Sequence, residues 1–213
     1  DSADYFLVLP YAFKDSFIDK NKDWIEKGGK FIFALPNTEV YPDINKKALI
    51  LGITGQDGSY LAEILLEKGY AVHGMYRKSA TGNTKNIDHI LDKINLHKGN
   101  LTDPLSIYKI INKVRPHEIY NEADQDHVSW SYDMSGYSYD VTGSAVGKIL
   151  DIVKDIDPKI RFFQPVSSNM FGKAEESPQN EETPFRPQSP YACAKAFAYI
   201  LSRYYRDVYG MHV

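Results

Sequence analysis

The most informative turn in this chain reads Gly52-Ile53-Thr54-Gly55-Gln56-Asp57-Gly58. It ends the apolar run Ala48 to Ile53, which predicts a buried strand, and it precedes Ser59 to Lys68, a segment with helical spacing that stops at Gly69. Glycines at this spacing let the backbone turn tightly and approach a pyrophosphate, and the following helix N-terminus offers unpaired N–H groups. Glycines also end strands for purely conformational reasons, so the order of strand, turn and helix carries the prediction of a dinucleotide-binding turn.

The chain beyond this turn continues to alternate between short apolar runs and longer amphipathic segments. The expected strands are Ala71 to Tyr76, Ile94 to His97, Glu118 to Asn121 and Arg161 to Val166, with a sixth opening at Met211 to Val213. The expected helices are Pro104 to Val114, Ser138 to Lys154 and Tyr191 to Tyr209. Such alternation implies parallel pairing with right-handed crossovers. We therefore expect an α/β fold of the Rossmann type, with a doubly wound parallel sheet.

A separate block precedes this domain. Tyr5 to Leu9 and Phe31 to Leu35 read as strands, and Lys14 to Lys27 between them reads as a helix. Asn37 to Lys47 is polar and rich in turn residues. We expect a strand-helix-strand block over residues 1–41, a linker over 42–47 and a dinucleotide-binding domain over 48–213.

The composition excludes several classes of protein. With 213 residues, 43% hydrophobic and 25% charged, the chain is neither disordered nor collagen-like. A net charge of −3 argues against nucleic acid as a partner. The apolar runs are far shorter than the roughly 20 residues that span a bilayer, and no signal peptide is recognisable. The single cysteine, Cys193, fits a reducing cytoplasm, and no cluster has metal-ligand spacing.

The end of the second strand bears on the choice of cofactor. NAD-binding chains usually place an Asp or Glu there, whereas the 2′-phosphate of NADP prefers Arg. This chain has Tyr76-Arg77-Lys78-Ser79, with no carboxylate. The pattern favours NADP, held by Arg77 and Lys78, although the two residues could also be ordinary surface cations.

A tyrosine and a lysine lie four residues apart near the start of the last helix. Tyr191 and Lys195 therefore share one helix face, and a nearby ammonium favours the phenolate form of tyrosine. Tyr191 could then move a hydroxyl proton while hydride passes to or from a nicotinamide. Ser167 follows the fifth strand and could hydrogen-bond the same substrate oxygen. An exposed helix pair with no function is the alternative interpretation.

Together these elements resemble the extended short-chain dehydrogenase/reductase family, and within it the GDP-mannose 4,6-dehydratases. The segments that carry the resemblance are Ala48–Glu63, Gly69–Gly74, Leu101–Asp103 and Thr183–Ala192, and it covers about residues 47–213. The resemblance implies a nucleotide-sugar substrate and catalytic roles for Ser167, Tyr191 and Lys195. It also implies that Tyr191 and Lys195 contact the cofactor. The remaining cofactor-binding residues that it implies are Gly52, Ile53, Thr54, Gly55, Gln56, Asp57, Gly58, Arg77, Lys78, Asn100, Leu101 and Tyr137, with Glu122 to Asp126 on the nicotinamide side.

The chain departs from the family pattern at the elimination base. In such dehydratases the sugar is oxidised at C4, a glutamate removes the C5 proton as the C6 hydroxyl leaves, and hydride returns at C6. That glutamate falls two positions after the catalytic hydroxyl, where this chain has Asn169, which cannot take up a proton. A nucleotide-sugar 4-reductase or epimerase, or a non-catalytic dinucleotide-binding remnant, therefore remains an alternative to a dehydratase.

The chain also departs from the family pattern by acidic residues after the predicted strand Glu118 to Asn121. The family's apolar strand end appears here as Asn121-Glu122-Ala123-Asp124-Gln125-Asp126. Three carboxylates beside a bound pyrophosphate would repel it unless they point away or are neutralised.

The leading block resembles the C-terminal end of sugar C-methyltransferases over about residues 3–41; a private N-terminal extension is the alternative. The chain starts with Asp1 and stops as a strand opens, so we expect a segment of a longer protein with its substrate-binding domain largely absent. We also expect that the protein forms a homo-oligomer.

Overall fold

The structure is a computed structural model that describes residues 5–8, 14–33, 39–41, 46–77 and 83–213. Its strands form two separate sheets, one of three strands in the leading block and one of five strands in the rest of the chain. Each sheet has hydrophobic core residues of its own.

The leading block contains β1 (Tyr5–Val8), α1 (Lys14–Lys20), α2 (Lys22–Glu26), β2 (Lys30–Phe33) and β3 (Glu39–Tyr41). β1 and β2 pair in parallel, as a strand-helix-strand unit requires, and β3 pairs antiparallel to β2. The sequence predicted turns over Asn37 to Lys47, but Glu39–Tyr41 forms the strand β3. Its pairing with β2 overrides the local turn propensity. Val8, Phe31 and Phe33 form the small core of this block.

The larger sheet is entirely parallel, with strand order β6-β5-β4-β7-β8. Its strands are β4 (Lys47–Leu51), β5 (Ala71–Tyr76), β6 (Asn95–Lys98), β7 (Glu118–Asn121) and β8 (Arg161–Phe163). The order confirms the expected doubly wound fold. From β4 the chain passes outward through β5 to β6 and then crosses back to β7 on the other side, so the order reverses between β4 and β7.

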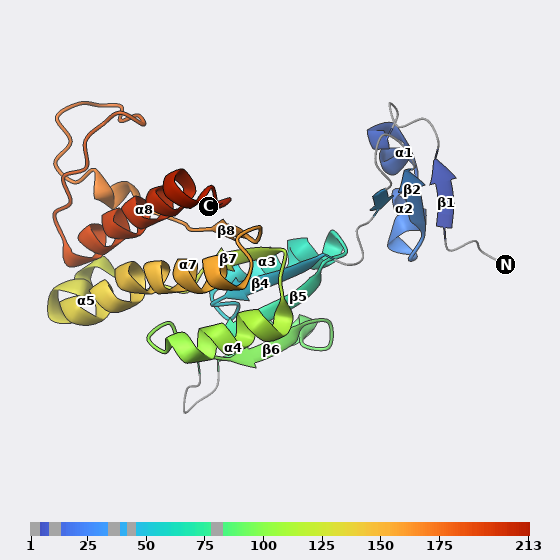
Figure 1. The fold of residues 1–213 in the computed structure, drawn as a ribbon, viewed down its shortest axis with the longest axis horizontal. Coiled ribbons are helices and arrows are strands. Elements are labelled where there is room, and N and C mark those ends of the chain that lie inside the picture. Colours follow the sequence, from blue (N-terminus) through green and yellow to red (C-terminus); the bar gives the residue numbers. More distant parts are fainter. Residues whose placement is uncertain (1–4, 9–13, 34–38, 42–45, 78–82) are drawn as a thin grey trace.

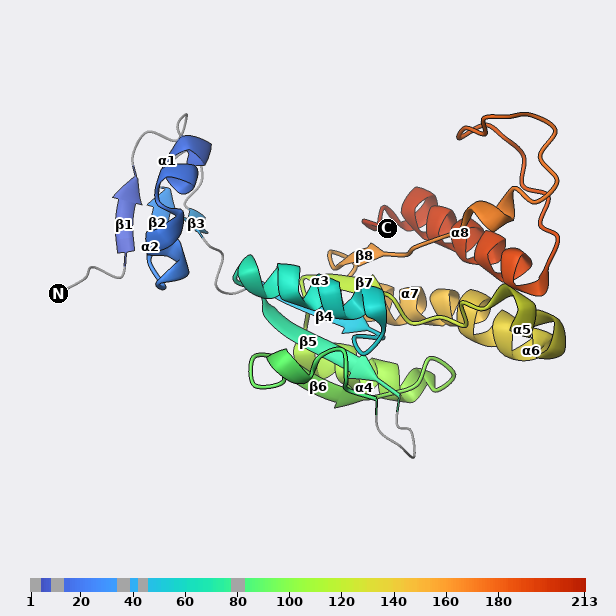
Figure 2. The same cartoon turned by 180° about the vertical axis from the view of Figure 1, so that it is seen from behind.

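Helices cover both faces of this sheet. α3 (Gln56–Glu67) lies on one face, and α4 (Pro104–Val114) and α7 (Ala145–Ile156) lie on the other (Figures 1 and 2). β4 explains why both faces must be covered: Ala48 and Ile50 pack toward α3, and the alternate residues Leu49 and Leu51 pack toward α4 and α7. All four side chains are fully buried, which accounts for a run that is continuously apolar.

The connection from β7 to α7 differs most from the expected single helix over Ser138 to Lys154. It contains α5 (Val128–Asp133), α6 (Ser135–Ser138) and a π-helical segment, η3 (Tyr139–Ser144), before α7 begins. A π-helical segment inside a helix commonly marks a functional position, because it changes the direction in which side chains point.

The last helix, α8 (Pro190–Tyr209), has well-defined ends. The Ser189 hydroxyl accepts a hydrogen bond from the Ala192 N–H at 3.1 Å, and Gly210 ends the helix in the left-handed conformation with φ of +64°. The expected sixth strand at Met211 to Val213 is not a strand, although the Phe162 N–H donates to the His212 carbonyl at 2.8 Å and this segment therefore runs beside β8. Among the described residues, no helix is long and apolar enough to cross a membrane.

Candidate functional site

The glycine-rich turn lies at the carboxyl end of β4, where the strand order reverses. Gly52 has φ of +85°, and a Cβ atom there would lie 2.8 Å from the backbone of Ala123, just after β7. A Cβ at Gly58 would lie 2.5 Å from the Gly52 carbonyl oxygen. Glycine at both positions is therefore required for α3 and the end of β7 to approach this turn. Parallel α/β sheets bind ligands in this crevice, outside the carboxyl ends of the strands.

The start of α3 is open for an anion. Its N-cap residue, Gly55, has no side chain with which to cap the first N–H groups of the helix. The turn itself is held by the Gly52 N–H, which donates to the Met75 carbonyl at 2.9 Å, and by the Asn86 side-chain amide, which donates to the Thr54 carbonyl at 3.0 Å. A fixed turn that leads into uncapped N–H groups is suited to a phosphate.

One cavity of about 460 Å³ connects this turn to the start of α8. The residues proposed from the sequence that line it are Gly52, Thr54, Gly55, Asp57, Arg77, Asn100, Leu101, Tyr137, Tyr191 and Lys195. Ile53 instead packs in the core beneath α3, and Gln56, Gly58 and Ser167 are not among the lining residues. Lys78 lies outside the described residues. The cavity therefore unites most of the two motifs, which are more than 130 residues apart in the sequence.

Lys195 is held by a buried ion pair. Its Nζ lies 2.6 Å from Asp124 Oδ2 and donates to the Pro165 carbonyl at 3.0 Å, and the side chains of Lys195 and Asp124 are only 4% and 15% exposed. The other carboxylate oxygen, Asp124 Oδ1, accepts from the hydroxyl of Thr142 in η3. Lys195 Nζ also lies 5.8 Å from the centre of the Tyr191 ring. Asp124 is thus one acidic residue of this segment that a cation neutralises.

Ser167 and Asn169 form a local unit after β8. The Ser167 hydroxyl accepts from the backbone N–H of Asn169 at 3.2 Å and from its side-chain amide at 3.1 Å. Ser167 is half-buried and Asn169 is exposed. The structure therefore brings Tyr191 and Lys195 into one cavity and leaves the Ser167 hydroxyl directed to Asn169.

On the β5 side of the cavity, Arg77 Nη1 donates to the Tyr137 hydroxyl at 2.9 Å. The two residues come from the end of β5 and from α6, so this bond spans the cavity between two elements. Asn100 uses its side-chain oxygen to accept from the Thr102 N–H at 3.1 Å, which fixes the turn after β6.

Comparison with known proteins decides the family. The model of the GDP-mannose 4,6-dehydratase family matches residues 49–213. The chain belongs to the GDP-mannose 4,6-dehydratase family. Among curated relatives, the GDP-mannose 4,6-dehydratase of Drosophila melanogaster is 47% identical over 178 residues, which cover 79% of this chain and 45% of that protein. The human GDP-mannose 4,6-dehydratase is 47% identical over 174 residues, 77% of this chain and 47% of that protein. The chain thus spans about half the length of the curated relatives it matches.

Solved structures show the same fold. The UDP-glucose 4-epimerase of Thermotoga maritima, solved with UDP-glucose, superimposes with a TM-score of 0.70 at 20% identity and covers 78% of this chain and 52% of that one. The dTDP-glucose 4,6-dehydratase of Bacillus anthracis, solved with NAD, superimposes with a TM-score of 0.68 at 24% identity and covers 79% and 53% of the two chains. At these identities the likeness establishes the fold of the GDP-mannose 4,6-dehydratase family and nothing finer.

Gly52 offers a direct test of the turn in this GDP-mannose 4,6-dehydratase family member. We expect Gly52→Ala to lower the free energy of unfolding by about 1–3 kcal/mol, because Ala is strained at positive φ and its Cβ meets the backbone of Ala123. Denaturant unfolding measures the change. Gly136→Ala is the matched control, since a Cβ at Gly136 has no atom within 4 Å and its φ is not positive. Equal losses in the two variants would contradict the close approach at Gly52.

Glu122 gives this family member a pH-dependent contribution to stability. The carboxyl lines the cavity, and burial, followed by the nearby charge of Asp57, raises its pKa above the usual 4.5, while Lys195 acts in the opposite direction. The folded state therefore keeps the Glu122 proton to higher pH than the unfolded state does. This contribution is present below pH 4.5 and is lost as pH rises through the raised pKa.

We therefore expect Glu122→Gln to be more stable than the unmodified protein at neutral pH and to lose this advantage on acidification. Melting temperatures of both proteins from about pH 4 to about pH 8 measure the difference. Other titrating groups, such as His73, are present in both proteins and cancel. A difference that stays constant over this range, or one that grows toward acid, would show that the Glu122 carboxyl is not destabilised in its charged form.

Proposed function

We propose that this chain binds NADP in the cavity between the glycine-rich turn and α8 and there oxidises a nucleotide sugar at C4. The observation that carries the proposal is the joint lining of one cavity by Gly52, Gly55, Tyr191 and Lys195. The family membership supports a nucleotide-sugar substrate resembling GDP-mannose, since the relatives are named for acting on it.

The residues present fit a dinucleotide. The glycine-rich turn and the uncapped start of α3 suit the pyrophosphate, and Asn100 and Leu101 suit the adenine side of the cavity. Arg77 is the described cation at the end of β5, where no carboxylate stands to accept a ribose 2′-hydroxyl. This pattern supports NADP over NAD, although a solved neighbour contains NAD.

Tyr191 and Lys195 have different roles in the proposed oxidation. The nicotinamide, when bound, supplies the hydride acceptor. The Tyr191 oxygen takes the proton of the sugar 4-hydroxyl, and Ser167, whose hydroxyl only accepts in its two contacts with Asn169, donates its own proton in a hydrogen bond to the same sugar oxygen. Lys195 has three N–H donors, of which Asp124 and Pro165 occupy two, so one remains for a ribose hydroxyl beside Tyr191.

With Asn169 in place of a base, the proposed reaction stops after oxidation at C4 and does not proceed to elimination. The amide stands at the position where the family resemblance places a glutamate, and it cannot accept the C5 proton. The proposal is therefore an oxidation at C4 without efficient loss of water. A 4-reductase or epimerase of the same family needs only Ser167, Tyr191 and Lys195 and is the second candidate.

The test is a single-turnover reaction of the protein with NADP and GDP-mannose. We expect NADPH fluorescence to rise toward one equivalent per chain without a 4-keto-6-deoxy product in the mass spectrum, and we expect Tyr191→Phe to abolish the rise. A 4-keto-6-deoxy product would overturn the assignment of Asn169. Cofactor binding without any NADPH formation would contradict the proposed oxidation and indicate a non-catalytic dinucleotide-binding protein.

The choice of cofactor has its own prediction. We expect Arg77→Ala to weaken NADP binding by about 10–100-fold, the range for one lost hydrogen bond to a charged group, and to leave NAD binding unchanged. Calorimetric titration with each cofactor measures both constants. Arg203→Ala, which removes an exposed cation from α8, is the control. An equal loss for NAD and NADP would show that Arg77 does not contact the 2′-phosphate.

For the leading block, we propose a separate unit related to the C-terminal end of sugar C-methyltransferases. Its own three-stranded sheet and its own core of Val8, Phe31 and Phe33 support a unit that is independent of the dinucleotide-binding domain. Limited proteolysis between residues 41 and 47 followed by circular dichroism of the fragments would test its independence.

A further inference from the structure

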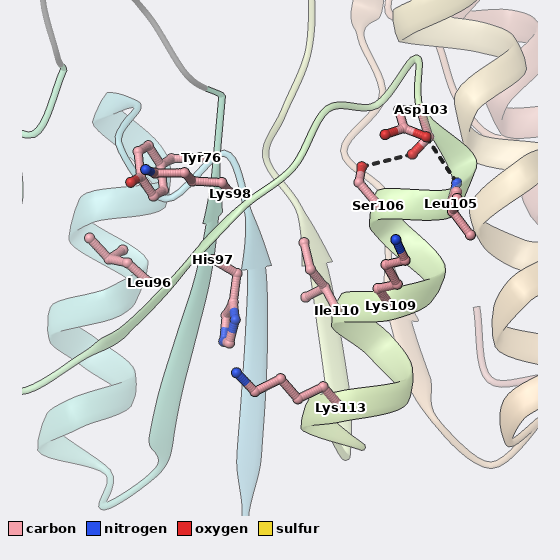
Figure 3. A pocket seen from close by; sticks show the side chains of 10 residues that line it. All are labelled: Tyr76, Leu96, His97, Lys98, Asp103, Leu105, Ser106, Lys109, Ile110 and Lys113. Carbon is pink, nitrogen blue, oxygen red and sulfur yellow. Dashed lines mark hydrogen bonds between the residues drawn. The ribbon is translucent and has the colours of Figure 1, made fainter.

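A second cavity, of about 470 Å³, lies between the edge strand β6 and helix α4. Figure 3 shows the side chains that line it: Tyr76, Leu96, His97, Lys98, Asp103, Leu105, Ser106, Lys109, Ile110 and Lys113. It shares no lining residue with the proposed cofactor cavity. The two cavities are therefore distinct sites of similar size.

The charge in this second cavity is unbalanced. Lys98, Lys109 and Lys113 contribute three ammonium groups, and among the described residues none of them pairs with a carboxylate. The one carboxylate in the lining, Asp103, already accepts from the Leu105 N–H at 3.1 Å as the cap of α4. By contrast, Lys195 in the cofactor cavity has a carboxylate partner at 2.6 Å.

Lys109 and Lys113 are one helical turn apart on the same face of α4, with their Cα atoms about 6 Å apart along the helix axis. Like charges at this spacing destabilise an isolated helix. A bound anion would remove that repulsion. The spacing also suits an anion with two neighbouring charged groups better than one with a single charged group.

Two half-buried histidines extend the site into the sheet. His73 Nδ1 and His97 Nε2 lie 3.0 Å apart, and the two rings stack at 18° with their centres 5.3 Å apart. Burial first, then the charges of His97, Lys47 and Lys113, lower the pKa of His73 to about 4. Burial and then Lys113 also lower the pKa of His97. Figure 3 shows the Lys113 side chain extending toward His97. The imidazole resonances of His73 and His97 should therefore respond to a ligand that binds beside Lys113.

We propose that the cavity between β6 and α4 binds a diphosphate group, either as inorganic pyrophosphate or as part of a nucleoside diphosphate. Lys109 and Lys113 would each contact one phosphoryl group. The His97 ring offers a further polar contact in the cavity lining. The site is separate from the proposed catalysis and does not depend on it.

The test follows the imidazole resonances of His73 and His97 by NMR at constant ionic strength. Titration with inorganic pyrophosphate should shift both resonances saturably, and GDP in a parallel titration distinguishes the free anion from the nucleotide: tighter binding of GDP assigns the nucleotide. The double variant Lys109→Gln/Lys113→Gln should weaken binding by at least about 10-fold, as expected for losing charge-assisted contacts. The control Lys148→Gln/Lys159→Gln removes two exposed lysines elsewhere and should not.

Two results would overturn the proposal. One is the absence of a saturable shift at His73 and His97 with either probe. The other is equal weakening by the two double variants, which would reduce the effect to general electrostatic attraction. Unchanged melting temperatures of the variants, which replace exposed side chains, would show that the loss of binding is not a loss of fold.

Discussion

Replacing Asn169 with glutamate is expected to raise formation of a 4-keto-6-deoxy product from GDP-mannose by about 10²–10⁴-fold, the usual contribution of one positioned general base. The Asn169 side-chain amide lies 3.1 Å from the Ser167 hydroxyl, so a side chain at this position lies beside the hydroxyl that is proposed to contact the sugar. Unlike the amide, a carboxylate can take the C5 proton as the C6 hydroxyl leaves. Mass spectrometry of the sugar nucleotide, with NADP present, measures the gain.

Asn169→Gln is the matched control for this experiment. It has the length of glutamate and no proton-accepting carboxylate, so it should leave the product at the level of the unmodified protein. A gain with both variants would attribute the effect to side-chain length. No gain with Asn169→Glu, in a protein that still reduces NADP in a single turnover, would show that the missing step needs more than this base.

Asp124→Ala is expected to lower the free energy of unfolding by about 3–5 kcal/mol, the cost of leaving one member of a buried ion pair without its partner. Lys195 is 4% exposed and its ammonium has Asp124 Oδ2 at 2.6 Å, so after the substitution its charge would keep only the Pro165 carbonyl. Denaturant unfolding measures the loss. Asp126→Ala is the control, because that side chain is 77% exposed and its contact to His127 is 3.7 Å long.

The double variant Asp124→Ala/Lys195→Met separates the ion pair from the packing. Apolar replacement of both partners of a buried pair is often neutral, so most of the lost stability should return. A double variant as unstable as Asp124→Ala alone would mean that Asp124 acts through Thr142 and the backbone and not through Lys195.

Much of the fold was predictable because its determinants are local. The strand over Ala48 to Ile53, the glycine-rich turn and the helix that follows each have their own signal, and together they imply parallel pairing. The helix predicted over Pro104 to Val114 has these bounds in the structure as α4. The family itself was visible in Gly55 to Glu63, and the match over residues 49–213 confirms it.

The parts that the sequence did not reveal depend on contacts between distant residues. The ion pair of Asp124 with Lys195 joins residues 71 positions apart, and only the fold shows that the acid after β7 faces the lysine of α8. The π-helical segment η3 has no recognised sequence signal, yet it carries Thr142, which donates to Asp124. The strand β3 was missed because its pairing with β2, and not its own composition, defines it. The second cavity joins His97 of β6 to Lys109 and Lys113 of α4 only through packing.

We propose that the cavity at the reversal of strand order binds NADP. Chemical-shift mapping of backbone amides during titration with NADP tests it most directly. We expect saturable shifts, with one cofactor per chain, at Gly52, Gly55 and Arg77, and smaller shifts at Lys109 and Lys113. Saturable binding whose shifts lie outside this cavity, or no binding at all, would contradict the account.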